Sequence, residues 1–188
     1  MNPQLFEGEL IRLASPDPDR DAETESKWTH DVEYMRLLSA DPVRPLSPAL
    51  IKKRYEELEK EKSNRRYDLA IRTRADDRLV GFVRLDHIEW NQGTCQLALG
   101  IGDSNDRGHG YGTEALKLIL RYAFAELNLH RVAVDTYEYN EGAQRFLERA
   151  GFTLEVRRRQ AVHRDGRRWD ALKLGLLRQE WEAKGHEQ

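Results

Sequence analysis

The chain has little cysteine, no long apolar stretch and no excess of charge of one sign. Its 188 residues include a single cysteine, Cys95, which excludes an internal disulfide and a zinc cluster built from several cysteines. No apolar run approaches the roughly 18 residues that a membrane-spanning helix needs. The first residues also lack the basic and apolar regions of a secretory signal. We therefore expect a cytoplasmic protein with no membrane partner.

The charge balance argues against a dedicated nucleic-acid binder, which usually carries a basic excess. The chain has 31 basic and 33 acidic residues, a net charge of -2, so we expect no nucleic-acid partner. Hydrophobic residues make up 39% of the chain, enough to build a core beneath a richly charged surface. The length fits one domain with elaborations. We expect a single domain over residues 1–188, with its core over about 5–181 and a polar tail over 182–188.

The first third of the chain is expected to be mostly helical after an initial strand. Ser47 is suited to cap a helix whose first position is taken by Pro48. Two prolines and three aspartates mark an earlier stretch as a surface loop. The sequence predicts a strand over 5–13, this loop over 15–21, a helix over 22–38 broken in its middle, and a charged helix over 49–62.

Strand patterns dominate the rest of the chain. Gly151 is suited to end a helix in the left-handed conformation, and Asp165-Gly166 is a preferred pair for a tight hairpin turn. The sequence predicts strands over 67–73, 79–86, 94–101, 131–137, 153–162 and 168–177, and helices over 110–127 and 140–150.

The order of these elements predicts an α/β fold built on one sheet. Three consecutive strands with short turns form an antiparallel meander. The helix between 94–101 and 131–137 is long enough for a crossover, so these two strands are expected to pair in parallel. We expect a single mixed, mostly antiparallel sheet with helices on both faces.

A glycine-rich loop is the most informative motif. Gly108, Gly110 and Gly112 alternate where a strand passes through a polar loop into a helix. Glycine lets the backbone approach a ligand, and the first turn of a helix directs N–H groups and a positive dipole outward. Arg107 adds a cation beside it. The motif predicts a phosphate or pyrophosphate site, whereas the structural alternative is an ordinary tight loop.

A dinucleotide-binding alternative also has to be weighed. Gly110-Tyr-Gly112-Thr-Glu-Ala115 matches G-x-G-x-x-A, and Asp135 lies twenty residues beyond Ala115, where a ribose-binding acid would be expected. However, that fold needs helix-linked strands before residue 100, and the pattern there predicts a meander.

Four segments together resemble the GNAT superfamily of acyl-CoA N-acyltransferases. Arg107-Gly-His-Gly110-Tyr-Gly112 resembles its pyrophosphate loop, and residues 140–152 (NEGAQRFLERAGF) resemble its N-x-x-A-x-x-(Y/F)-x-x-x-G-F helix. Residues 165–181, and the opening with LIRL at 10–13 and WTHDVEYM at 28–35, resemble the branch that acetylates N-termini of ribosomal proteins. The resemblance covers residues 5–181.

The resemblance implies that acetyl-CoA is the co-substrate, with no metal, in a cleft where strands 94–101 and 131–137 splay apart. The pantetheine arm would pair with the first of these strands, and Asn140 would lie near the thioester. Phe146 occupies a position where many members have a tyrosine that protonates the thiolate, so the general acid is left open. The implied cofactor-binding residues are Leu99, Gly100, Ile101, Arg107, Gly108, His109, Gly110, Tyr111, Gly112, Thr113, Asn140 and Phe146.

Candidate catalytic groups come from two other places. His87 and Glu89 lie at a strand end before the turn into the cofactor strand, and either could bind or deprotonate the amine. The alternative is that they are ordinary polar turn residues. Tyr137, with Tyr139 and Asn140, could order a water at the sulfur, or the tyrosines could simply pack at a strand end. Cys95 is interpreted as a buried structural thiol.

The sequence thus predicts an acetyl-CoA-dependent N-acetyltransferase that acts by direct attack of a primary amine, without a covalent enzyme intermediate. The favoured acceptor is a protein N-terminal α-amine. The alternatives are a small amine, such as a polyamine, amino sugar or amino acid, and a non-catalytic acyl-CoA sensor. The basic residues over 157–168 are interpreted as a solvated hairpin face, or as a contact for an acidic substrate or the CoA 3′-phosphate. We allow for a homodimer.

Overall fold

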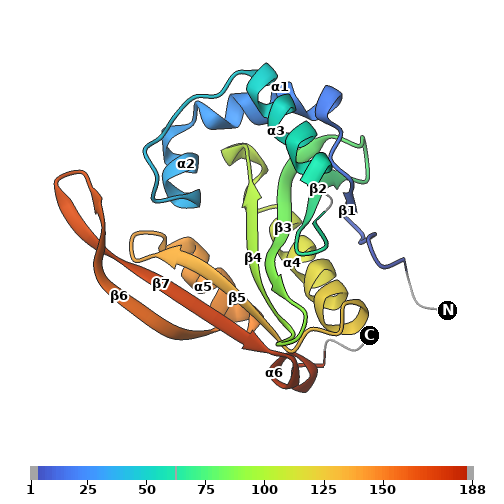
Figure 1. The fold of residues 1–188 in the computed structure, drawn as a ribbon, viewed down its shortest axis with the longest axis vertical. Coiled ribbons are helices and arrows are strands. Elements are labelled where there is room, and N and C mark those ends of the chain that lie inside the picture. Colours follow the sequence, from blue (N-terminus) through green and yellow to red (C-terminus); the bar gives the residue numbers. More distant parts are fainter. Residues whose placement is uncertain (1–3, 62, 186–188) are drawn as a thin grey trace. The chain divides into compact units, whose positions relative to one another are not determined.

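The computed structural model describes residues 4–61 and 63–185. Seven strands form one sheet in the order β1-β2-β3-β4-β5-β7-β6 (Figure 1). The strands are β1 (Ile11–Ala14), β2 (Tyr67–Thr73), β3 (Leu79–Glu89), β4 (Thr94–Ile101), β5 (Arg131–Tyr137), β6 (Thr153–Arg164) and β7 (Arg167–Leu177). The helices are α1 (Pro18–Thr29), α2 (Val32–Leu38), α3 (Pro48–Glu61), α4 (Tyr111–Arg121), α5 (Glu141–Ala150) and α6 (Arg178–Ala183).

The pairing confirms the expected sheet. β4 and β5 are parallel, with Thr94 opposite Arg131 and Gln96 opposite Ala133. β1–β2, β5–β7 and β6–β7 are antiparallel. Because β2, β3 and β4 are sheet neighbours joined by short turns, they form the predicted meander. The fold is therefore α/β with one mixed, mostly antiparallel sheet, as the sequence predicted. No helix in the described ranges is long and apolar enough to cross a membrane.

Backbone contacts divide the chain into two compact units, which we describe separately. Unit 1 contains residues up to Arg84 together with Leu99–Ile119, and unit 2 contains Leu85–Ala98 and the chain from Leu120 onward. Strands β3 and β4 contribute to both units. The single-domain organisation over 1–188 stays a prediction.

In unit 1 the sequence placed two boundaries wrongly. The first strand begins at Ile11 rather than at residue 5, and α1 begins at Pro18, inside the expected loop. Asp17 caps α1 by accepting hydrogen bonds from the backbone of Asp19 and Arg20 (3.2 and 3.3 Å). An aspartate-rich, proline-containing segment suits a helix start as well as a loop, because acids favour the positive end of the helix dipole.

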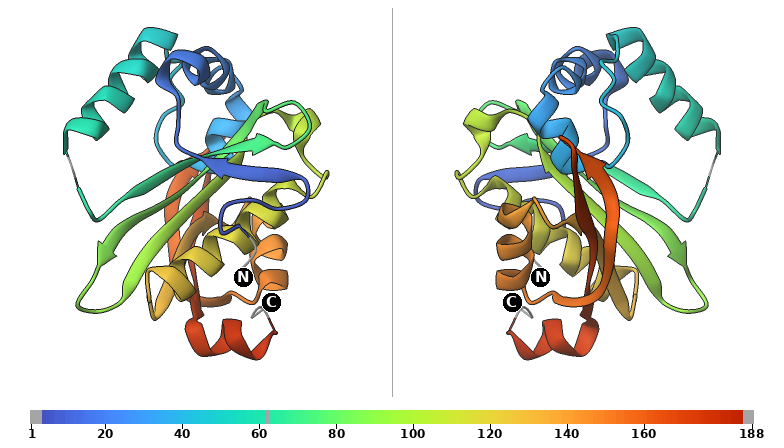
Figure 2. Two further views of the ribbon diagram at one scale, coloured as in Figure 1. Left: turned by 90° about the vertical axis from the view of Figure 1, so that its right-hand side faces the viewer. Right: turned by 90° about the vertical axis from the view of Figure 1, so that its left-hand side faces the viewer.

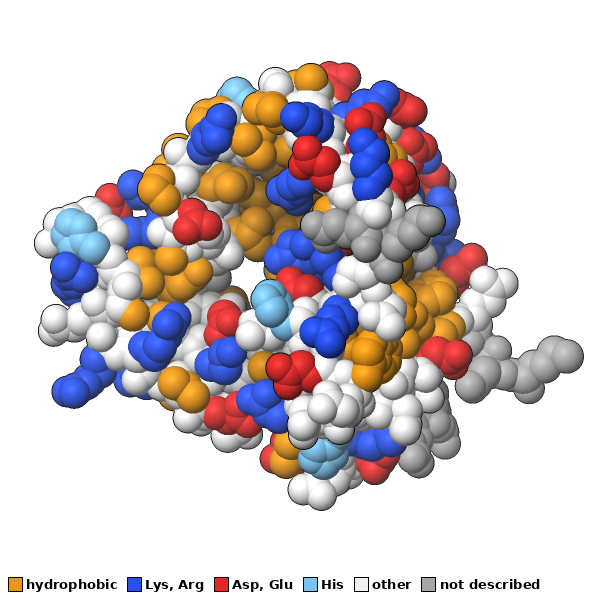
Figure 3. Space-filling view, viewed as in Figure 1, with side chains coloured by type: hydrophobic (Ala, Val, Ile, Leu, Met, Phe, Trp, Pro, Cys, Tyr) orange, Lys and Arg blue, Asp and Glu red, His pale blue; other side chains and the backbone are white. Residues whose placement is uncertain are grey.

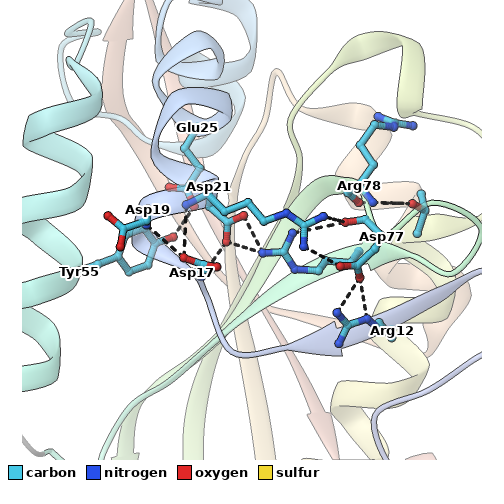
Figure 4. A network of polar contacts seen from close by, with 11 residues as sticks. Arg12, Asp17, Asp19, Asp21, Glu25, Tyr55, Asp77 and Arg78 are labelled. Carbon is cyan, nitrogen blue, oxygen red and sulfur yellow. Dashed lines mark hydrogen bonds and ion pairs between the residues drawn. The ribbon is translucent and has the colours of Figure 1, made fainter.

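A buried ion pair fixes this helix start onto β2 (Figure 4). Arg72 donates to both carboxylate oxygens of Asp21 (2.6 and 2.8 Å), and the two side chains are 3% and 1% exposed. Asp21 also accepts from the backbone N–H of Asp17 at 2.8 Å. Burying two charges is costly unless their hydrogen bonds are satisfied, and these bonds reduce that cost. The pair therefore joins α1 to β2 at a defined position.

Unit 2 is built around the long hairpin of β6 and β7. Residues 171–177 of β7 pair with β5. Towards the turn, β7 pairs with β6, from Trp169 opposite Val162 to Arg167 opposite Arg164. Figure 2 (right) shows this curved hairpin, with α6 at the end away from the turn. Asp165 and Gly166 have φ values of 52° and 70°, which confirms the predicted turn.

Several other helices and strands can be compared with their predicted boundaries. β3 continues to Glu89, so His87 and Glu89 lie within the strand. The long helix expected over 110–127 is α4 followed by a π-helical segment, Tyr122–Glu126. Ser47 caps α3 through the N–H of Leu50 at 3.3 Å, as predicted. Trp181 lies at the end of the predicted core, is 6% exposed and packs on Phe124, whereas the helix α6 that carries it was not predicted.

Candidate functional site

The glycine-rich loop of unit 1 has the backbone conformation that the motif predicts. After β4 the chain makes a short 3₁₀ turn, Ser104–Asp106, and then enters α4. Gly108 and Gly110 have φ values of +81° and +88°, which side-chain-bearing residues rarely adopt. A Cβ added at Gly108 would meet no atom within 4 Å, and one at Gly110 would lie 3.1 Å from Leu10 Cδ1. The loop thus leaves its backbone uncovered at Gly108.

The start of α4 lies against the end of β4. A Cβ at Gly112 would lie 3.7 Å from Ile101 Cγ1 and 3.8 Å from Leu99 Cδ2. The fold therefore brings together two groups of predicted cofactor-binding residues, those at the end of β4 (99–101) and those in the glycine-rich loop (107–113). The first N–H groups of a helix have no carbonyl partner within the helix, so those of Tyr111, Gly112 and Thr113 can bind an anion. This chemistry fits a pyrophosphate.

Arg107 is held beside this loop. Its guanidinium donates to the carbonyls of Ile101 (3.4 Å) and Gly102 (3.5 Å) and lies over the Tyr34 ring, 5.9 Å from its centre. Tyr34 is buried, and burial raises the pKa of its hydroxyl. His109 is close by, with its Nδ1 3.0 Å from the carbonyl oxygen of Arg107. The long hydrogen bonds of Arg107 leave its charge available to a phosphate.

Glu114 is a residue that the sequence analysis missed. Its carboxylate, in the first turn of α4, accepts three backbone hydrogen bonds from Glu9 (2.7 Å), Leu10 (2.8 Å) and Ile11 (2.8 Å). A Cβ on Gly8 would collide with this carboxylate. The three N–H donors offset the negative charge of the Glu114 carboxylate next to the anion site. They also hold the segment that leads into β1 against the start of α4. The only available signal was an acid in the first turn of a helix.

In unit 2, His87 is positioned by a local distortion of β3. It has a φ of 49°, which is strained for a residue with a side chain. Its side chain is 77% exposed, and Nδ1 lies 2.8 Å from Oδ1 of Asp86. A carboxylate partner at Nδ1 favours the tautomer with its proton on Nδ1, in which Nε2 is the proton acceptor. Glu89 is exposed two residues further on.

Asn140 and Tyr137 are engaged in structural contacts. The Asn140 side chain caps α5 by accepting from the N–H of Ala143 at 3.1 Å. Tyr137 stacks on Tyr139 with ring centres 5.2 Å apart. Phe146 is half-buried on α5. The stacked ring of Tyr137 is the packing role considered as its alternative, whereas the cap formed by Asn140 was not foreseen, and the roles of both residues in the reaction stay predictions.

The other residues singled out from the sequence have clear structural roles. Cys95 is buried, and this burial raises the pKa of its thiol to about 12, as expected for a structural cysteine. Trp28, the first residue of the WTHDVEYM segment, is core, 8% exposed, and packs edge-on to Tyr34. Asp135 forms an ion pair with Lys173 at 3.5 Å. Because the strands before residue 100 form a meander, the dinucleotide alternative is set aside.

Comparisons with known proteins agree with this fold. A structure of spermidine N-acetyltransferase from Vibrio cholerae with CoA and spermine superposes with a TM-score of 0.81 at 18% identity, covering 92% of this chain and 98% of that one. A "putative acetyltransferase" from T. thermophilus superposes with a TM-score of 0.76 at 26% identity, covering 95% and 91%.

Curated relatives are similar over part of the chain. "Probable N-acetyltransferase YjcK" of Bacillus subtilis is 40% identical over 65% of this chain and 66% of its own length. "Putative ribosomal N-acetyltransferase YdaF" of Bacillus subtilis is 31% identical over 57% and 58%. The chain thus spans less than two thirds of the length of these two relatives. The model of the acetyltransferase (GNAT) domain matches residues 10–153. The chain therefore belongs to the GNAT acetyltransferase family.

Proposed function

We propose that this protein is an acetyl-CoA-dependent N-acetyltransferase that transfers the acetyl group to a primary amine. The observation that carries the proposal is the loop from Arg107 to Thr113. It combines two left-handed glycines, the open first turn of α4 and a guanidinium beside them. These features suit the pyrophosphate of CoA.

The same proposal assigns roles to the residues around the loop. Backbone N–H groups from Arg107 to Thr113 would hold the pyrophosphate. The backbone of Leu99, Gly100 and Ile101 would pair with the pantetheine arm, in the way that an extended peptide adds to a strand. Asn140 would lie near the thioester, and Phe146 would pack against the cofactor.

The proposed reaction is direct acyl transfer. The neutral amine nitrogen attacks the thioester carbonyl carbon, a C–N bond forms and the C–S bond breaks. The proton lost by the amine goes to a base, and a proton returns to the leaving thiolate, giving an amide and CoA. The high pKa of Cys95 in its buried position argues against that thiol as an acyl carrier.

His87 is the base that we propose. Its exposed ring is oriented by Asp86, so Nε2 can accept the proton of the amine directly or through one water. Glu89 is the second group proposed to bind the incoming amine. Tyr137 is proposed to order a water at the sulfur, because Phe146 has no proton to donate.

A protein N-terminal α-amine is the favoured acceptor. The relative named as a putative ribosomal N-acetyltransferase supports this choice. A small amine is the second candidate, because the structural neighbours include spermidine N-acetyltransferases.

Calorimetric titration with acetyl-CoA, CoA and NAD in parallel tests the proposal. We expect acetyl-CoA to bind at micromolar strength and Gly110→Val to weaken it at least tenfold, because valine is strained at φ +88° and meets Leu10. The matched control is Gly185→Val, at another left-handed glycine (φ +74°) with no atom within 4 Å. A folded protein that binds no CoA would refute the proposal. Tight binding without acetyl transfer to any amine would identify a sensor.

The base is tested by the double variant His87→Gln with Glu89→Gln. We expect kcat/KM for the amine to fall by about 10²- to 10⁴-fold, the usual contribution of a general base, while acetyl-CoA binding stays unchanged. An unchanged kcat/KM would eliminate both residues as the base or amine ligand.

A further inference from the structure

The β6–β7 hairpin carries a charge opposite to that of the whole chain. From Thr153 to Leu177 it contains seven basic and three acidic residues, a formal charge of +4 in a chain of net charge -2. Six of the seven basic residues are arginines. Figure 3 shows blue Lys and Arg side chains grouped over this hairpin, at the lower left of the view. The whole-chain balance therefore conceals a strongly basic element.

The basic side chains differ in how they are held. Arg157 donates to Asp170 at 2.7 Å, and Arg167 lies over the Trp169 ring, 4.0 Å from its centre. Arg158, Arg159 and Arg168 are exposed, and within the described residues none of them forms an ion pair, although the charge of Arg159 helps to lower the pKa of Asp170. Three guanidinium groups thus project from the hairpin without an ion-pair partner in the part of the chain that the structure describes.

The hairpin is also unusually open. Every residue of β6 from Thr153 to Ala161 is exposed, and β6 is the last strand in the sheet order. In a strand, successive side chains point to opposite faces, so the exposed Arg167 and Arg168 of β7 place cations on both sides of the hairpin. An exposed strand of this length presents a binding surface rather than one half of a core.

The structure disfavours two kinds of partner for this edge. A second copy pairing antiparallel along β6 and centred on Arg158 would bring Arg157 opposite Arg159. Like charges directly opposite destabilise a strand pair. An added peptide strand would meet a bulge between Arg158 and Val162, where Gln160 has a φ of 54°. The N–H of Gln160 is already donated to Asp170 at 2.8 Å. A bulge interrupts the regular ladder that strand addition needs.

The partner that remains is a polyanion bound through side chains. Guanidinium groups bind phosphates with two parallel hydrogen bonds, and cations on both faces of a two-stranded ribbon suit a phosphate backbone. We infer that the β6–β7 hairpin is a cationic arm that binds the phosphate backbone of a nucleic acid. The whole-chain charge led us to expect no such partner, because a net charge averages over this arm.

Fluorescence anisotropy with a labelled 20-nucleotide single-stranded RNA tests the inference, using the full chain at 50 mM salt. Parallel titrations use single-stranded DNA, duplex DNA and a 20-residue polyglutamate. The test variant is Arg158→Ala with Arg159→Ala and Arg168→Ala. The matched control removes three exposed basic residues elsewhere, by Lys53→Ala with Lys60→Ala and Arg65→Ala.

We expect the RNA to bind and the three-arginine variant to bind at least tenfold more weakly. The slope of log K against log salt should fall in magnitude by about 2, because each phosphate contact to a single strand contributes about 0.7. The control variant should keep the original slope. Unchanged acetyl-CoA binding and melting temperature of both variants would show that folding and the proposed cofactor site are intact.

Four results would overturn the inference. Neither the RNA nor either DNA could bind at 50 mM salt, or the control variant could weaken binding as much as the test variant does. Polyglutamate could bind more tightly than any nucleic acid, which would make the arm a site for an acidic protein segment. Excess CoA could displace the RNA, which would assign these arginines to the CoA 3′-phosphate. Binding to DNA but not RNA would keep the inference and change the source of the phosphates.

Discussion

At the scale of single residues, Asp77 joins three segments of unit 1 (Figure 4). Its carboxylate accepts from Arg12 Nε at 2.8 Å and from Arg20 Nη1 at 2.6 Å. It also occupies the β2–β3 turn with a φ of 56°. The hydrogen bond from Arg20, and then that from Arg12, lowers the pKa of Asp77. The turn was predictable from the sequence, but its two arginine partners were not.

Because its pKa is lowered on folding, Asp77 stabilises the protein above the ordinary pKa of an aspartate. That stabilisation is lost as the pH falls through the lowered value. We expect Asp77→Asn to be less stable than wild type at pH 7 and the difference to shrink towards pH 2.5. Asparagine tolerates a positive φ, so the backbone is preserved.

Urea denaturation between pH 7 and pH 2.5 measures this difference. Glu59→Gln, at an exposed carboxylate of α3, is the control and should show little change at any pH. An Asp77→Asn deficit of the same size at both ends of the pH range would contradict the electrostatic account.

At the scale of whole elements, α6 is a short helix that depends on the burial of one side chain. Trp181 is 6% exposed and packs against Phe124, with ring centres 5.3 Å apart. Glu180 accepts the N–H of Leu177 at 2.9 Å and satisfies the helix start. Six mostly polar residues would not hold a helix alone, because short helices are marginal in water. The burial of one tryptophan therefore orders the segment.

Trp181→Ala should reduce the free energy of unfolding by about 3–5 kcal/mol, the usual cost of removing a buried aromatic side chain. Trp90→Ala is the matched control, because that tryptophan is 41% exposed and should cost much less. Denaturant unfolding of both variants measures the difference. Equal costs would mean that Trp181 does not anchor α6.

At the scale of the whole molecule, the central part of the strand order, from β2 to β5, follows from features that the sequence displays. Alternating strand patterns with short turns predicted the meander, and one helix-linked crossover predicted the parallel β4–β5 pair. Both follow from chain geometry, since a short turn can join only antiparallel neighbours. The glycine loop was predictable for a similar reason, because its conformation depends on residues next to one another.

The burial and the partners of polar residues were not predictable in the same way. The sequence analysis assigned Asp21 to a surface loop, yet it is buried against Arg72, fifty-one residues away. Glu114 contacts a backbone segment more than a hundred residues before it. Nothing local in the sequence distinguishes these carboxylates from the exposed ones.

The sequence by itself determined the features that depend on local backbone energetics. These include the left-handed glycine Gly151, the Asp165-Gly166 turn, the Ser47 cap and the periodicity of the strands. The tertiary structure alone decided where α1 begins, why α6 exists and which of the described arginines on the β6–β7 hairpin are held in ion pairs. Desolvation and pairing of a side chain depend on groups that are distant in sequence, and only folding brings them together.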